Sequence, residues 1–240
     1  MKAEAIVARF PGDDYVGFHS RRYALVLQLL AAHAPHAKTI LDIGPSTLTT
    51  LVAEQYGTPV DSIGFEDVGT NTTGGTHFGF DLNRLPDAMS EPAALGRYDV
   101  VLCCEVLEHL LVAPQHLLAW LREHMTDRGV LVLQTPNAAA FDRRLKLLAG
   151  RHPYDALDPA RSGARHVREC TFAELDALAL EAGFAVVAAE RGAYFDYRYA
   201  AGAHGRHGSR TLRHRVQNAV DRTLPPSLRS GITLVLAPTG

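Results

Sequence analysis

Residues 39–53 read Thr39-Ile-Leu-Asp-Ile-Gly-Pro-Ser-Thr-Leu-Thr-Thr-Leu-Val-Ala53, which is an apolar run, a turn and a second apolar segment. The run predicts a short buried strand, and Gly44 and Pro45 end it. Ser46 or Thr47 can then cap a helix whose apolar residues recur on one face. A strand, a tight turn and a helix N-terminus in this order predict a ligand site above the edge of a parallel sheet.

Apolar runs and amphipathic segments alternate along the rest of the chain. Together with residues 40–43, the predicted strands are residues 60–65, 76–80, 98–104, 130–135, 184–197 and 231–237. Helices are predicted at residues 21–33, 114–125, 141–148 and 171–182, the last with a capping box of Thr171 and Glu174. This alternation predicts an α/β fold with a doubly wound, mostly parallel, seven-stranded Rossmann-like sheet. The last two strands lack a crossover helix of the usual length between them, which predicts one antiparallel strand near the C-terminus.

The 240 residues contain no internal repeat and no clear linker, so we expect a single domain over residues 1–240. Residues 1–37 are predicted to be an N-terminal helical segment, and residues 38–192 the ligand-binding core. Residues 203–230 form a basic insertion before the last strand, with six arginines and one acidic residue.

Composition limits the class of protein. Hydrophobic residues make up 47% of the chain and charged residues 21%, as is usual for soluble globular proteins. The net charge of −2 does not favour nucleic-acid binding driven by bulk electrostatics. Three cysteines do not make a disulfide framework, and neither a signal peptide nor an apolar run of about 20 residues is present. We therefore expect a cytoplasmic protein without a transmembrane segment.

Four predicted strand ends carry acidic residues: Asp42, Glu66, Asp81 and Glu105. A carboxylate such as Glu66, after the second strand, can accept hydrogen bonds from both hydroxyls of a ribose. Asp81 can accept one from the exocyclic amine of adenine. Over roughly residues 38–192, this constellation resembles the class I S-adenosylmethionine-dependent methyltransferases.

The resemblance implies S-adenosylmethionine as the cofactor. In that family the first strand and its glycine loop hold the methionine end, the acid after the second strand binds ribose, and an acid–apolar pair flanks adenine. The cofactor-binding residues implied here are Asp42, Gly44, Pro45, Glu66, Asp81, Leu82 and Glu105. A Rossmann dehydrogenase is the alternative, but a pyrophosphate needs several glycines and would be repelled by a carboxylate in the strand. The loop departs from the family in one respect, since Pro45 and the two residues after it replace further glycines.

A second motif is Cys104-Glu-Val-Leu-Glu-His-Leu110, in which a helical turn would project Glu105, Glu108 and His109 to one side. Two carboxylates and an imidazole so close together either repel one another or share a cation. In the structural interpretation, Glu105 points at the cofactor while Glu108 and His109 cap and pack the next helix. In the other interpretation, the three bind a divalent ion such as Mg²⁺ or Zn²⁺.

Small-RNA 2′-O-methyltransferases and some ubiquinone-pathway O-methyltransferases look similar at this spacing. In the former a second histidine much further along the chain completes a metal site, and His166 lies at a comparable distance here. The resemblance therefore implies Glu105, Glu108, His109 and His166 as candidate metal ligands. His109 and His166 are also candidate catalytic bases, and His166 is alternatively an ordinary loop histidine.

The expected reaction is methyl transfer from the sulfonium of S-adenosylmethionine to a hydroxyl. An alcohol is a poor nucleophile at neutral pH and needs a base or a metal ion. Residues 134–137, at the end of the fifth strand, are predicted to line the acceptor pocket. We expect an O-methyltransferase whose acceptor is a small molecule or a sugar-containing (glycan) biosynthetic intermediate.

Two other functions stay open. A metal-dependent RNA 2′-O-methyltransferase would present residues 203–230 as a basic surface continuous with residues 105–109. That segment is otherwise a site for a phosphate-bearing substrate or an anionic membrane, or a solvated surface helix. A non-catalytic partner or regulatory protein would keep the fold while the altered loop at Pro45 fails to bind the cofactor. The sequence does not predict the acceptor atom or the oligomeric state.

Overall fold

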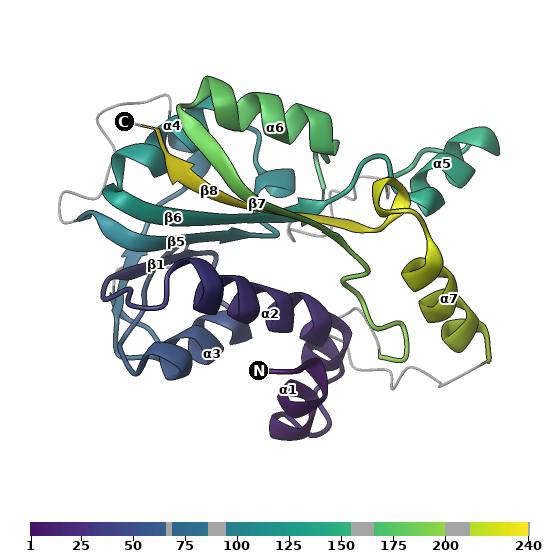
Figure 1. Ribbon diagram of the computed structural model, residues 1–240, viewed down its shortest axis with the longest axis horizontal. Helices are drawn as coiled ribbons and strands as arrows, with labels where there is room; N and C mark the ends of the chain where they lie inside the picture. Colours follow the sequence, from purple (N-terminus) through teal and green to yellow (C-terminus); the bar gives the residue numbers. More distant parts are fainter. Residues whose placement is uncertain (66–68, 86–94, 155–165, 200–211, 240) are drawn as a thin grey trace.

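The computed structural model describes residues 1–65, 69–85, 95–154, 166–199 and 212–239. Within these residues one sheet of eight strands has the order β3-β4-β2-β1-β5-β6-β8-β7 (Figure 1). The strands are β1 (Ile40–Ile43), β2 (Asp61–Gly64), β3 (Gly69–Thr70), β4 (Thr76–Gly79), β5 (Tyr98–Cys104), β6 (Met125–Pro136), β7 (Phe184–Gly192) and β8 (Gly231–Pro238). The central strands β1 and β5 are buried along nearly their whole length, as expected for parallel strands covered on both faces.

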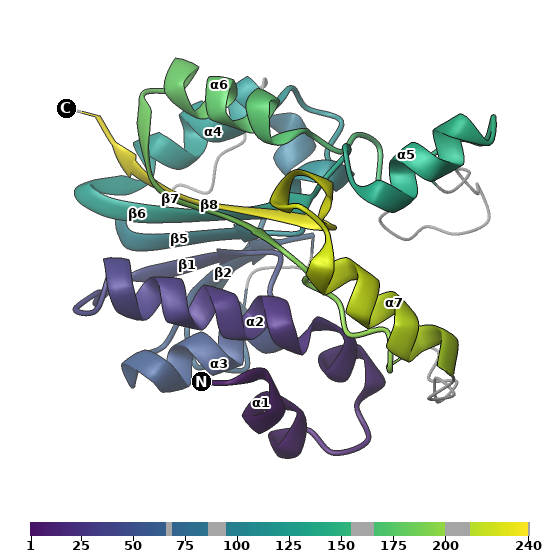
Figure 2. The same ribbon diagram turned by 45° about the vertical axis from the view of Figure 1, so that its right-hand side comes forward.

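Helices cover both faces of the sheet (Figures 1 and 2). The helices of the described residues are α1 (Ala3–Arg9), α2 (Asp14–His33), α3 (Thr47–Tyr56), α4 (Pro114–Glu123), α5 (Phe141–Leu148), α6 (Phe172–Glu181) and α7 (Leu212–Thr223). Three short 3₁₀ helices are η1 (Leu82–Arg84), η2 (Leu107–His109) and η3 (Pro226–Leu228). Side chains of α1, α2 and α3 pack on one face, and those of α4 and α6 pack on the other. None of the helices in the described ranges is long and apolar enough to cross a bilayer.

The predicted mostly parallel α/β sheet is confirmed, but the predicted number of strands is wrong: the sheet of the described residues has eight strands and not seven. The added strand is β3, in which Gly69 and Thr70 pair antiparallel with β4 at the sheet edge. Two exposed residues, one of them glycine, are too few to show the apolar alternation of a strand, so a pattern search does not find β3. The predicted antiparallel strand near the C-terminus is β8, which pairs antiparallel with both β6 and β7.

The second helix begins earlier than predicted. The sequence indicated a helix from residue 21, whereas α2 begins at Asp14 because the Asp13 side chain accepts a hydrogen bond from the Val16 backbone N–H. The added turns bring Phe18 and His19 to the carboxyl edge of the sheet. The capping box of Thr171 and Glu174, predicted from the sequence, is confirmed at the start of α6.

Candidate functional site

The turn between β1 and α3 has the geometry that the sequence predicted. Gly44 has φ +73°, a conformation that favours glycine, and a Cβ atom here would lie 3.1 Å from Cγ2 of Val106. Ser46 caps α3, and Thr49 completes a capping box with it. The Thr49 hydroxyl also donates to a carboxylate oxygen of Asp42 at 2.6 Å. The loop therefore presents a helix N-terminus at the sheet edge, beside a buried carboxyl group.

Burial raises the pKa of Asp42 to about 7, although the hydrogen bond from Thr49 opposes the shift. The folded protein keeps the Asp42 carboxyl protonated up to a higher pH than the unfolded chain does. The free energy of unfolding therefore falls as pH rises from about 4 to about 7. Asp42→Asn removes the dependence. We expect the stability of the variant relative to wild type to increase by roughly 2–3 kcal/mol between pH 5 and pH 8, measured by urea unfolding. A difference that does not change with pH would contradict this assignment.

The predicted adenosine side of the site is only partly described. Glu66 lies outside the described residues. The Asp81 side chain accepts hydrogen bonds from the backbone and side-chain N–H groups of Asn83, which fixes the carboxylate at the start of η1. Leu82 is buried in the apolar core beneath this turn. A cavity of about 390 Å³ borders Pro45 and Ser46 on one side and residues 69–72 on the other.

Arg22 is a functional candidate that the sequence analysis missed. It is buried on α2, where its guanidinium lies 4.5 Å from the Tyr23 ring centroid. Its Nε donates to Nδ1 of His19 at 2.8 Å, and Nη1 donates to Oε1 of Gln134 at 3.3 Å. Burial and the Arg22 charge lower the pKa of His19 to about 2, so this imidazole stays neutral and accepts the bond. Among the described residues no carboxylate lies within ion-pair distance of this buried cation.

Glu105 has an unusual backbone and an unsatisfied side chain. Among the described residues it is the one non-glycine residue with positive φ, at 60°. The prediction that Glu105 shares a helical turn with Glu108 and His109 is wrong, because this left-handed residue lies before η2 and outside its turn. Its N–H donates to the Gln134 carbonyl at 2.7 Å, which holds it at the end of β5. Burial raises the pKa of Glu105, and the nearby Arg22 opposes the shift. Its buried Oε1 accepts no hydrogen bond.

Three predicted ligands do converge. One potential ligand atom each from Glu108, His109 and His166 lies within 4.8 Å of the others. Oε1 of the fully buried Glu108 is 3.8 Å from Nε2 of His109 and 3.9 Å from Nε2 of His166, and it accepts no hydrogen bond. Burial and the charge of Glu105 raise the pKa of Glu108 well above its usual range. Glu105, the fourth predicted ligand, is not part of this cluster.

Glu169 and Arg143 fix the orientation of His166. Oε1 of Glu169 lies 2.7 Å from Nδ1 of His166, and Arg143 donates to both carboxylate oxygens at 2.7 and 3.0 Å. Burial would raise the pKa of Glu169, but the hydrogen bonds from His166 and Arg143 outweigh it and the pKa is lowered. An ionised Glu169 accepts a hydrogen bond from Nδ1 of His166, which orients the ring so that Nε2 faces Glu108.

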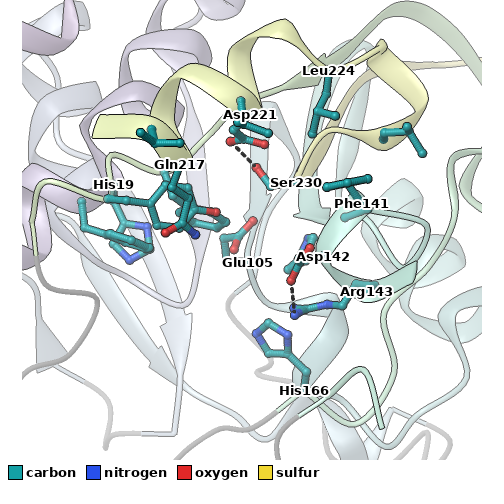
Figure 3. A pocket seen from close by; sticks show the side chains of 18 residues that line it. His19, Glu105, Phe141, Asp142, Arg143, His166, Gln217, Asp221, Leu224 and Ser230 are labelled. Carbon is teal, nitrogen blue, oxygen red and sulfur yellow. Dashed lines mark hydrogen bonds and ion pairs between the residues drawn. The ribbon is translucent and has the colours of Figure 1, made fainter. Parts of the chain in front are cut away.

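A cavity of about 910 Å³ opens beside this cluster, between α2, α5 and α7 (Figure 3). Glu105 and His166 form part of its wall, and Asp221 and Ser230 lie across from them (Figure 3). Its apolar and aromatic lining is Phe18, Pro136, Ala140, Phe141, Phe195, Tyr197, Val216, Val220, Leu224 and Leu228. Of the predicted acceptor-pocket residues 134–137, Pro136 lines the cavity. Gln134 and Thr135 are buried, bonding to Arg22 and Glu108 respectively.

A family model described as a methyltransferase domain matches residues 15–189. The chain belongs to this methyltransferase family. No match was found among curated proteins. The matched region of this methyltransferase begins inside α2 and ends within β7, so it includes Arg22, the β1–α3 turn and the cluster around Glu108.

Solved methyltransferase structures share the fold at low sequence identity. The CcbJ methyltransferase from Streptomyces caelestis has 16% identity and a TM-score of 0.53, and the match covers 95% of this chain and 96% of that one. The 1,6-didemethyltoxoflavin N1-methyltransferase from Burkholderia thailandensis, with S-adenosylhomocysteine bound, has 15% identity and a TM-score of 0.53, covering 100% and 92%. An O-methyltransferase from a trans-AT PKS multienzyme of Brevibacillus brevis has 12% identity and a TM-score of 0.53, covering 90% and 71%.

Proposed function

We propose that this methyltransferase uses S-adenosylmethionine to methylate a hydroxyl group of a small molecule with a large apolar part. The observation that carries the proposal is the cavity that combines an apolar and aromatic wall with Glu105 and His166, directly beside the cluster of Glu108 and His109. A volume of about 910 Å³ is in the range of pockets that hold drug-sized ligands. In the reaction the S–CH₃ bond breaks, the O–CH₃ bond forms, and the hydroxyl proton passes to a base.

The surroundings of β1 support the cofactor. S-adenosylmethionine carries one carboxylate, and Arg22 is a buried cation without an ion-pair partner among the described residues. A buried charge is stable only when it is paired, so Arg22 is suited to hold that carboxylate. Asp81, held at the start of η1 by Asn83, is suited to accept a hydrogen bond from adenine. Two of the similar solved structures contain S-adenosylhomocysteine, the demethylated product of this cofactor.

The cluster of Glu108, His109 and His166 fits a divalent cation. The donors are one carboxylate oxygen and two imidazole nitrogens, a set that suits Zn²⁺ better than Mg²⁺. The buried Glu108 oxygen without a hydrogen bond is the atom that a cation would satisfy. A bound cation would lower the pKa of a coordinated hydroxyl. Without one, His109 or His166 would accept the proton of the acceptor hydroxyl.

The charge of the cavity favours a small acceptor over RNA. Glu105, Asp142 and Asp221 contribute carboxylates to its lining. Among the described lining residues, Arg143 is the only arginine or lysine, and it is paired with Glu169 and Asp142. The α7 residues that line the cavity are Val216, Gln217, Val220 and Asp221, so no described arginine of α7 lies in its wall. A phosphodiester would therefore meet mostly like charge. The part of that segment at 203–211 lies outside the described residues.

The test is a methyl-transfer screen with labelled S-adenosylmethionine against apolar hydroxylated metabolites, nucleotide sugars and small RNAs. We expect turnover with the first group and loss of turnover after chelation, restored by Zn²⁺. Calorimetry with S-adenosylhomocysteine provides an independent measurement of cofactor binding. Absence of binding would rule out every catalytic function and leave the non-catalytic partner. Turnover that chelation does not change would rule out the metal.

A further inference from the structure

α5 is an amphipathic helix without a buried face. Its apolar residues Phe141, Leu145 and Leu148 lie at positions i, i+4 and i+7, so they form one stripe along the helix. None of its residues is buried, and Leu148 is 84% exposed. Exposed apolar stripes are unusual in a monomeric protein and mark surfaces that contact a partner or a membrane.

α7 carries a similar stripe on the other side of the cavity. Leu212, Val216 and Val220 are four residues apart, and all are exposed, Leu212 to 77%. Phe141 from α5 and Val216 and Val220 from α7 also line the cavity, so its apolar wall continues onto the outer surface. Both helices project from the end of the sheet, away from the layers that cover its faces (Figures 1 and 2). We call these two stripes the α5–α7 face.

Exposed arginines flank this face. Arg144 and Arg151 belong to α5 and the turn after it, and Arg215 and Arg222 belong to α7. None of the four makes an ion pair with another described residue. Residues 141–151 and residues 212–229 each carry a net charge of +3, although the whole chain carries −2. Positive charge is therefore concentrated where apolar side chains are exposed.

We propose that the α5–α7 face docks on the surface of an anionic lipid bilayer. Helices that lie in a membrane interface combine exposed leucine and phenylalanine with flanking arginine and lysine, and the basic groups pair with anionic headgroups. A bilayer also adapts to two separate projecting helices, whereas a rigid protein would need a matching shape. The helices are too short to span the membrane, so the contact is peripheral. Docking turns the cavity mouth toward the bilayer, so an acceptor with an apolar chain would enter from the lipid; this consequence rests on the proposed function.

The experiment is co-sedimentation of the full chain with vesicles of phosphatidylcholine and phosphatidylglycerol in equal parts. We expect the protein to bind these vesicles, to bind pure phosphatidylcholine vesicles weakly, and to dissociate at high salt. Leu148→Ser should lower the partition coefficient about tenfold. Arg215→Gln with Arg222→Gln should weaken binding to the anionic vesicles only. Leu180→Ser is the matched control, because this leucine is 73% exposed on α6 and should bind like wild type.

Thermal unfolding and calorimetry with S-adenosylhomocysteine establish that each variant is folded and binds the cofactor. The proposal is overturned if wild type binds neither type of vesicle, or if Leu148→Ser binds as wild type does. It is also overturned if light scattering shows a dimer that Leu148→Ser dissociates while vesicles are not bound, because a second copy then covers the face. Failure of cofactor binding would reject the proposed function and leave the vesicle result unchanged.

Discussion

Glu108→Gln is expected to lower kcat/KM for methyl transfer by at least about a hundredfold and to abolish metal binding. The substitution removes the buried carboxylate oxygen on which His109 and His166 converge, while an amide of nearly equal size keeps the packing. In the absence of metal, by contrast, the substitution should stabilise the folded protein at alkaline pH. Because the pKa of Glu108 is raised by folding, its contribution to stability falls as pH rises, so the variant should unfold at a higher temperature than wild type at pH 8.

Two measurements separate this expectation from general damage. Addition of Zn²⁺ should raise the unfolding temperature of wild type and leave that of Glu108→Gln unchanged. Glu181→Gln, at an exposed position at the end of α6, is the control and should keep both the metal response and the activity. If Glu108→Gln destabilises the metal-free protein at pH 8, the carboxylate is a structural partner of Thr135 and no metal ligand.

Local sequence signals predicted the central strands of the sheet. They did not predict the edge strand β3 or the start of α2. β5 is apolar throughout and bounded by polar residues, so its limits were predicted to the residue. β3 has only Gly69 and Thr70, and its pairing with β4 depends on tertiary contact. α2 was predicted seven residues too short because its first two turns carry few aliphatic residues. Asp13 is a residue type that often caps a helix, so the cap before α2 is a signal that the sequence does contain.

The sequence predicted one pair of neighbouring residues in the cluster and one residue far from them along the chain. Glu108 and His109 are adjacent, and the family resemblance supplied His166, which the fold places within reach of both. Glu105 was assigned to the same helical turn, but its positive φ separates it from the cluster. A spacing of three or four residues predicts a shared face only if the backbone is helical.

The position of Arg22 in the sequence also contains a signal for a functional residue. It precedes Val26 by four residues and Leu30 by eight, so it occupies the apolar face of an amphipathic helix. A charged residue on such a face must find a partner when the helix packs, and that requirement is itself a functional indication. Glu169 and Arg143 gave no comparable signal, since their role depends on contacts between α5 and the loop before α6.

Arg22→Met is expected to weaken binding of S-adenosylhomocysteine about a hundredfold, or roughly 3 kcal/mol. Methionine fills much of the same volume and removes the only described cation that is buried beside the β1–α3 turn without an ion-pair partner. The comparison that isolates the carboxylate uses decarboxylated S-adenosylhomocysteine. Wild type should bind this analogue weakly, and Arg22→Met should bind both ligands with similar affinity.

Arg144→Met, at an exposed position on α5, is the control and should bind S-adenosylhomocysteine as wild type does. An equal loss of affinity for both ligands in Arg22→Met would mean that Arg22 maintains the local structure through His19 and Gln134. A selective loss for the carboxylate-bearing ligand would place the methionine end of the cofactor against α2. The early start of α2 at Asp14 would then be part of the binding site, because the turns capped by Asp13 carry His19, which holds the Arg22 guanidinium in place.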